Sequence, residues 1–148
     1  MTDLLLEVLS KYGLNEVPGP QSNPEILEFF TELGYDWVED DSTMSWCSAM
    51  LSYYAKKCGY VYHKQLDARG WLKMPLMVLK PSVGDIVVLW RENITSWKGH
   101  VGLFIAWDAK RVYVLGGNQS NQINITAYSR DRILGIRKLK KAENVSDL

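Results

Sequence analysis

The chain has 148 residues, of which 47% are hydrophobic and 23% are charged, and 17 lysines and arginines balance 17 aspartates and glutamates. This length predicts one domain with a substantial core, and the zero net charge argues against a protein that binds nucleic acid mainly through phosphates. The chain has no apolar run of about 18 residues, as a membrane span requires, and its start, MTDLLLE, lacks the features of a signal peptide. We therefore expect a protein made in the cytoplasm without a signal peptide, with no nucleic-acid partner and no stable membrane association.

The first 60 residues predict three helices. Apolar residues recur at helical spacing between residues 4 and 12, and Gly13 follows them as a helix terminator. Asn23-Pro24 is typical of an N-cap followed by the first helical residue, and this second helix is expected to end at Gly34. A third helix is predicted from Ser45 to Gly59.

From Pro81 onward the pattern changes to short strands. Strands are predicted at residues 86–90, 100–107, 111–115, 122–125 and 133–139, separated by turn-forming Gly, Asn, Asp and Ser. Helices followed by consecutive strands predict an α+β fold, with N-terminal helices packed on an antiparallel sheet of about five strands. We expect a single domain over residues 1–140 and a polar C-terminal tail over residues 141–148.

The two cysteines, Cys47 and Cys58, lie on the same predicted helix, eleven residues apart. A helix rises 1.5 Å per residue, so about 16 Å separates them, whereas a disulfide needs Cα atoms within about 7 Å. Free thiols are therefore expected, as in a reducing compartment.

Three segments supply the side chains of a thiol-dependent acyl-transfer site. Cys47 opens the third predicted helix, where the unpaired backbone N–H groups and the helix dipole favour a thiolate. His100 opens a strand and could act as the general base. Asn118 closes the following strand, and its side-chain carbonyl could fix the tautomer and orientation of the imidazole.

Other site chemistries have little support. Two cysteines and two histidines without C-x-x-C or H-E-x-x-H spacing argue against zinc, and no glycine-rich phosphate loop is present. The acidic stretch at residues 36–41 lacks the ligand spacing of an EF-hand loop, although calcium stays an open alternative. His63, in a tyrosine-rich connection, is expected to be structural. No cofactor and no metal are expected.

These motifs resemble those of the CHAP and NlpC-type cysteine peptidases, which share a papain-like fold. The resemblance is carried by Trp46-Cys47, by PSVGDIVV at residues 81–88 and by GHVG at residues 99–102. More narrowly, EVPGP at 16–20, Asn23-Pro24, ARGWL at 68–72 and LGGNQS at 115–120 are similar to a compact branch found in phages, prophages and bacterial genomes. The similarity spans about residues 13–137.

The resemblance implies hydrolysis of peptidoglycan, within the stem peptide or at the amide that joins it to the sugar. It makes Cys47 the nucleophile, His100 the general base and Asn118 the orienting third member. This chain departs from the pattern at two positions: many CHAP enzymes carry a glutamate where it has Gly116, and the branch often has proline where Ser45 stands. Expected substrate contacts are Trp46, Arg69, Trp71, Trp97 and Gln119.

The expected protein is a bacteriolytic cysteine amidase or endopeptidase, such as a phage endolysin. Holin-type release or a secretion machine would bring it to the cell wall or periplasm, and an inhibitor or immunity protein could accompany it. The alternatives are a papain-like toxin or deamidase that modifies proteins, a secreted antibacterial effector amidase, and a catalytically silent domain that kept the fold.

Overall fold

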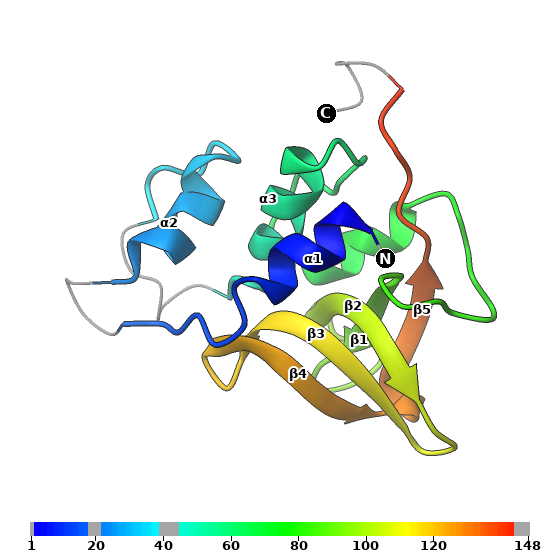
Figure 1. Cartoon of the computed structure of the whole chain (residues 1–148). Helices are drawn as coiled ribbons and strands as arrows, with labels where there is room; N and C mark the ends of the chain where they lie inside the picture. The colour runs from blue at the N-terminus through cyan, green and yellow to red at the C-terminus, as the bar shows by residue number, and fades with distance from the viewer. Residues whose placement is uncertain (1, 18–21, 39–44, 144–148) are drawn as a thin grey trace.

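A computed structural model describes residues 2–17, 22–38 and 45–143 of the chain (Figure 1). Within these ranges, the helices are α1 (Asp3–Leu9), α2 (Pro24–Thr31), α3 (Cys47–Lys57) and the short 3-10 helices η1 (Ala68–Lys73) and η2 (Arg130–Arg132). The strands are β1 (Ile86–Trp90), β2 (Gly99–Trp107), β3 (Arg111–Gln119), β4 (Gln122–Ser129) and β5 (Ile133–Arg137). They form one antiparallel sheet in the order β4-β3-β2-β1-β5, which confirms the expected α+β class.

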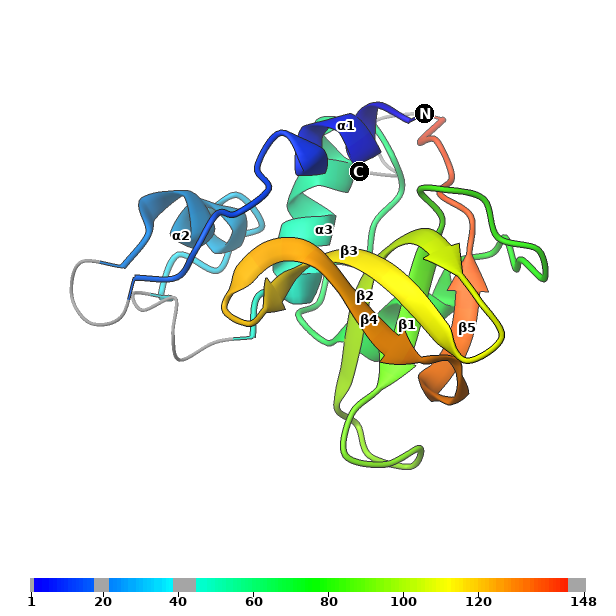
Figure 2. The same cartoon turned by 60° about the horizontal axis from the view of Figure 1, so that its bottom comes forward.

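The sheet has a different core on each of its two faces. Helices α1 and α3 cover one face, and α2 lies beside α3 (Figure 1). The main core between this helical layer and the sheet includes Leu4, Trp46, Leu51, Leu103 and Leu115. The strands β3 and β4 curve strongly (Figure 2), and a smaller core on the second face contains Val87, Leu89, Phe104, Val112 and Val114.

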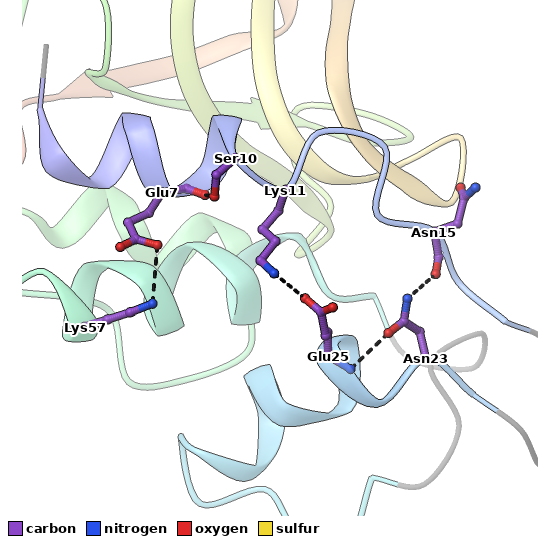
Figure 3. Close-up of polar contacts among 7 residues, drawn as sticks. All are labelled: Glu7, Ser10, Lys11, Asn15, Asn23, Glu25 and Lys57. Carbon is purple, nitrogen blue, oxygen red and sulfur yellow. Dashed lines mark hydrogen bonds and ion pairs between the residues drawn. The ribbon is translucent and has the colours of Figure 1, made fainter.

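Helix α2 begins where the sequence predicts it. The side chain of Asn23 accepts a hydrogen bond from the backbone N–H of Glu25 at 2.9 Å, so it satisfies one unpaired donor of the first turn. Asn23 also donates to the carbonyl oxygen of Asn15 at 2.8 Å, and Lys11 forms a 2.8 Å ion pair with Glu25 (Figure 3). These contacts join α2 to the segment that follows α1.

Several element boundaries differ from those expected. The first helix ends at Leu9, and the third begins at Cys47 and ends at Lys57. The strands β3 and β4 extend by four residues each, to Gln119 and Ser129, because they form one long hairpin. Both cysteines are free, as expected, and none of the helices in the described ranges is long and apolar enough to cross a membrane.

The hairpin of β3 and β4 contains a bulge near its turn. Gly116 pairs with Asn124 and Gln119 pairs with Gln122, so β3 has one more residue than β4 between these two pairs. Asn118 lies in this stretch with a φ of 58°, in the left-handed region. Since successive side chains of a strand alternate between faces, the extra residue reverses which side chains of β3 point to each face.

Candidate active site

Cys47 is the first residue of α3, and its side chain is buried. The first backbone N–H groups of a helix have no partner within the helix, and the helix dipole favours a negative charge at this end. The preceding residue, Trp46, makes no side-chain hydrogen bond that caps this end of the helix.

The surroundings of Cys47 favour its thiolate. Burial opposes ionisation and would raise the pKa, but the charge of His100 and its hydrogen bond to the thiol act in the opposite direction. Hydrogen bonds from the backbone N–H of Val101 and from Ser45 lower the pKa further. The net effect lowers the pKa of Cys47 from 9.0 to about 7, so a large fraction of the thiol ionises near neutral pH.

His100 lies near the start of β2, paired with Leu89 of β1, and is buried. Its Nε2 atom forms a hydrogen bond of 2.8 Å with Oε1 of Gln119. The remaining ring nitrogen, Nδ1, is therefore the one available to Cys47. Cys47, His100 and Gln119 thus form a series in which His100 lowers the pKa of the thiol and is itself held by Gln119.

The amide of Gln119 fixes the tautomer of His100. The amide nitrogen donates to the carbonyl oxygens of Val114 at 3.1 Å and Asn124 at 2.7 Å. Carbonyl oxygens only accept hydrogen bonds, so the amide nitrogen must face them and Oε1 must face the histidine. An oxygen acceptor at Nε2 requires the proton on Nε2, which leaves Nδ1 of the neutral imidazole as the base.

The position beside His100 that was expected for Asn118 is occupied by Gln119. The side chain of Asn118 instead donates to Oγ of Ser45 at 3.1 Å. The physical reason is the bulge in β3: Gln119, opposite Gln122, takes the sheet face that holds Leu89, Val114 and His100. The glycine pair before Asn118 is the sequence feature that could have indicated this bulge, since glycine inside a strand often marks one.

Ser45 connects Asn118 to the thiol. Its hydroxyl oxygen lies 3.9 Å from Sγ of Cys47, and this contact is one of those that lower the thiol pKa. Because Asn118 donates to this oxygen, the hydroxyl proton is free to point elsewhere. Asn118 is therefore a residue that positions Ser45.

Tyr128 is a site residue that the sequence did not indicate. Its ring centroid lies 5.4 Å from that of His100, and its hydroxyl donates to Oε1 of Gln119 at 3.1 Å. Burial, together with the charge of Cys47, raises the pKa of Tyr128 to about 12, against the opposing effect of Arg132 and Arg91. The phenol thus stays protonated and acts as a second donor to Gln119.

A cleft of about 470 Å³ opens beside Cys47. This volume lies within the range of small-molecule and peptide binding sites. Its lining combines the thiol with charged side chains of both signs; the lining residues are Ser45, Cys47, Leu66, Asp67, Ala68, Arg91, Glu92, Trp97, Lys98, Gly99 and Arg132.

Of the five expected substrate contacts, the structure brings only Trp97 to the cleft, where it is 75% exposed. Trp46 and Trp71 are core residues, and their indole N–H groups donate to Glu16 at 2.8 Å and to Ser48 at 3.0 Å. The reason is packing of α3 against the sheet and η1, which leaves neither ring exposed to a ligand. The side chain of Gln119 is buried, and its Oε1 atom lies 2.8 Å from Nε2 of His100.

Arg69 binds protein carbonyls instead of a substrate carboxylate. Its guanidinium donates to the carbonyl oxygens of Lys98, Ile94 and Asn93 at 2.8, 2.8 and 2.9 Å. All three nitrogens are thus engaged, and their function is to hold the connection between β1 and β2.

His63 has a structural partner, as expected of it. Its Nε2 lies 2.7 Å from Oδ1 of Asp67, which lines the cleft. The ring packs so closely on Gly70 that a Cβ built there would lie 2.0 Å from Nε2. No group of three or more metal-ligating side chains occurs among the described residues, and residues 39–41 of the acidic stretch lie outside them.

Comparison with known proteins adds no assignment to this geometry. No protein-family model matches the sequence, and a search of curated proteins gives no match.

Proposed function

We propose that this chain is a papain-like cysteine hydrolase that cleaves an amide bond in or next to the stem peptide of peptidoglycan. The observation that carries the proposal is the series from Cys47 through His100 to Gln119, with a thiol pKa of about 7 and an adjoining cleft. Peptidoglycan as substrate rests on the resemblance to CHAP and NlpC-type peptidases.

The chemistry begins with transfer of the thiol proton from Cys47 to Nδ1 of His100. The thiolate then attacks the amide carbonyl carbon, and the C=O electron pair moves to the oxygen. When the tetrahedral intermediate collapses, the C–N bond breaks and the imidazolium gives its proton to the leaving amine. Water, deprotonated by His100, then attacks the thioester, which releases a carboxylic acid and regenerates the thiol.

The oxyanion of the intermediate has two candidate donors near Cys47. One is the backbone N–H of Cys47 itself, which has no partner within α3 because it belongs to the first helical residue. The second is the hydroxyl of Ser45, which lines the cleft and whose oxygen already accepts from Asn118. The backbone N–H is fixed before the substrate binds, and the Ser45 hydroxyl, whose oxygen is held by Asn118, would turn its proton from the sulfur to the oxyanion once the C–S bond has formed.

The route to the wall proposed with this function is holin-type release or delivery by a secretion machine. An enzyme delivered into a competing cell would also be matched by an inhibitor or immunity protein in the producing cell.

The proposal is tested on purified Gram-negative peptidoglycan labelled with a covalent dye. Wild-type protein is expected to release soluble dye, and Cys47→Ala is expected to release none while unfolding at an unchanged temperature. Cys58→Ala is the matched control, because Cys58 lies outside the cleft at the end of α3 and should release dye at the wild-type rate.

Two outcomes would reject the proposal. Release by Cys47→Ala would assign the chemistry elsewhere. No release by the wild type, with Cys47-dependent deamidation of a protein glutamine, would favour a protein-modifying enzyme.

A further inference from the structure

The cleft beside Cys47 contains two arginines that have no acidic partner among the described residues. Arg91 directly follows β1, and Arg132 directly precedes β5; both line the cleft. The acidic residues of the cleft are already paired, since Asp67 lies 2.7 Å from His63 and Glu92 lies 2.7 Å from Lys98. None of the ion pairs among the described residues includes either arginine.

Arg132 is held in a fixed orientation. Its Nε and Nη2 atoms donate to the carbonyl oxygen of Trp90 at 3.1 and 2.9 Å. The guanidinium also lies 5.3 Å from the ring centroid of Trp90 and 5.5 Å from that of Tyr128. Its Nη1 atom makes no hydrogen bond among the described residues, so a donor remains on a guanidinium that is already ordered.

Arg91 complements this fixed group with an exposed charge that forms no ion pair within the part of the chain that the structure describes. Its backbone N–H donates to the carbonyl oxygen of Lys98 at 3.3 Å, which anchors the main chain at the base of the 91–98 connection. The charges of Arg91 and Arg132 both act on the hydroxyl of Tyr128, which donates to Gln119. Arg132 thus lies beside Tyr128, whose ring is packed against that of His100, and Arg91 lines the same cleft.

We propose that Arg91 and Arg132 form a carboxylate-binding subsite, so that the preferred substrate carries a free carboxylate close to the scissile amide. A planar guanidinium matches a carboxylate geometrically, and charge-assisted hydrogen bonds are stronger than neutral ones. This subsite takes the substrate-contact role expected for Arg69, each of whose three guanidinium nitrogens donates to a protein carbonyl. The carboxylate-binding subsite deepens the proposed function and rests on it, because that function supplies the peptide substrate.

The charge of the subsite can be measured without any substrate. In a Cys58→Ser background, Cys47 is modified by three methanethiosulfonates whose transferred groups carry a sulfonate, a trimethylammonium or a neutral methyl. Each reagent gives a mixed disulfide on Cys47 and releases methanesulfinate, and mass spectrometry follows the rate. Dividing by the rate of the neutral reagent removes any change in the pKa of the thiol.

Arg91→Gln is expected to lower the ratio of the sulfonate rate to the neutral rate by about threefold to fivefold. Arg91→Lys should retain most of the ratio of the sulfonate rate to the neutral rate. Arg132→Lys tests the second arginine while keeping its positive charge. Lys110→Gln is the matched control, since it removes one positive charge from the turn between β2 and β3, outside the cleft. The wild-type ratio should also fall in 0.5 M NaCl, because salt screens exposed charges. An unchanged ratio in Arg91→Gln overturns the subsite.

The second measurement uses two stem peptides that differ only in whether one carboxylate is free or amidated. The wild type should prefer the free acid in kcat/KM, and Arg91→Gln should lose about tenfold on the free acid and little on the amide. Equal losses on both peptides contradict the subsite. If the wild type cleaves neither peptide nor the wall, the proposed function fails, and the reagent ratios still decide whether the subsite exists.

Discussion

The ionisation of Cys47 depends on a balance between burial and three neighbouring groups. Burial raises its pKa, and His100, the N–H of Val101 and Ser45 more than offset this effect. The histidine makes the largest opposing contribution, because an imidazole that has taken the thiol proton favours the thiolate both by its charge and by its hydrogen bond.

The first prediction concerns the pH dependence of this thiol. The rate of alkylation of Cys47 by iodoacetamide should rise with pH through an inflection at about 7, below the ordinary value of 9.0, because only the thiolate reacts. Ser45→Ala removes a stabilising contact and should move the inflection upward. Cys58 does not interfere, since burial raises the pKa of its thiol. An inflection near 9 in the wild type would contradict this account of the site.

The second prediction distinguishes Gln119 from Asn118. Gln119→Ala removes the acceptor at Nε2 of His100 and should lower the hydrolysis rate by at least about tenfold, because the tautomer is no longer fixed. Asn118→Ala acts only through Ser45 and should cost less than about fivefold. Both variants are compared with the wild type in hydrolysis rate, in the pH profile of Cys47 alkylation and in unfolding temperature. A larger loss in Asn118→Ala, with the larger shift of the profile, would return the orienting role to Asn118.

At the scale of elements, the hairpin of β3 and β4 determines which side chain reaches His100. The alternation of strand residues could be read from the sequence as far as Leu115, and the strand starts agree with the structure to within one residue. Beyond Gly116 the bulge changes the phase, and bulges follow from local backbone geometry that residue periodicity does not encode. This is why the sequence predicts Cys47 and His100 as catalytic candidates but predicts Gln119 only as a substrate contact.

The third prediction concerns the contact between this hairpin and α3. A Cβ at Gly117 would lie 2.5 Å from Cζ3 of Trp46 and 3.2 Å from Sδ of Met50. The indole cannot move freely because its N–H is bonded to Glu16. Gly117→Ala should therefore lower the free energy of unfolding by about 1–3 kcal/mol, measured by urea denaturation.

A double variant provides the control for this contact. Trp46→Leu removes the ring atoms that a Cβ at Gly117 would meet, so the two substitutions together should cost less than the sum of their separate effects. Strict additivity, or a Gly117→Ala protein as stable as the wild type, would show that the two elements are not packed as described.

At the scale of the whole molecule, the site joins the two layers of the fold. The helical layer contributes Cys47 and the sheet contributes His100 and Gln119, so the site assembles only when α3 is docked on the sheet. The helices and strands could be predicted because hydrophobic periodicity and caps are local signals. The cleft and the contact of Tyr128 with His100 could not, because both depend on segments that only the tertiary fold brings together.

The most direct test of the account is digestion of purified Gram-negative peptidoglycan in water enriched in ¹⁸O, followed by mass spectrometry of the fragments. Hydrolysis through a Cys47 thioester predicts fragments with one ¹⁸O in a new carboxylate and a matching new amine, present with wild-type and Cys58→Ala protein and absent with Cys47→Ala. The fragment masses would also identify the bond. An unchanged wall, or fragments cut only in the glycan, would contradict the account.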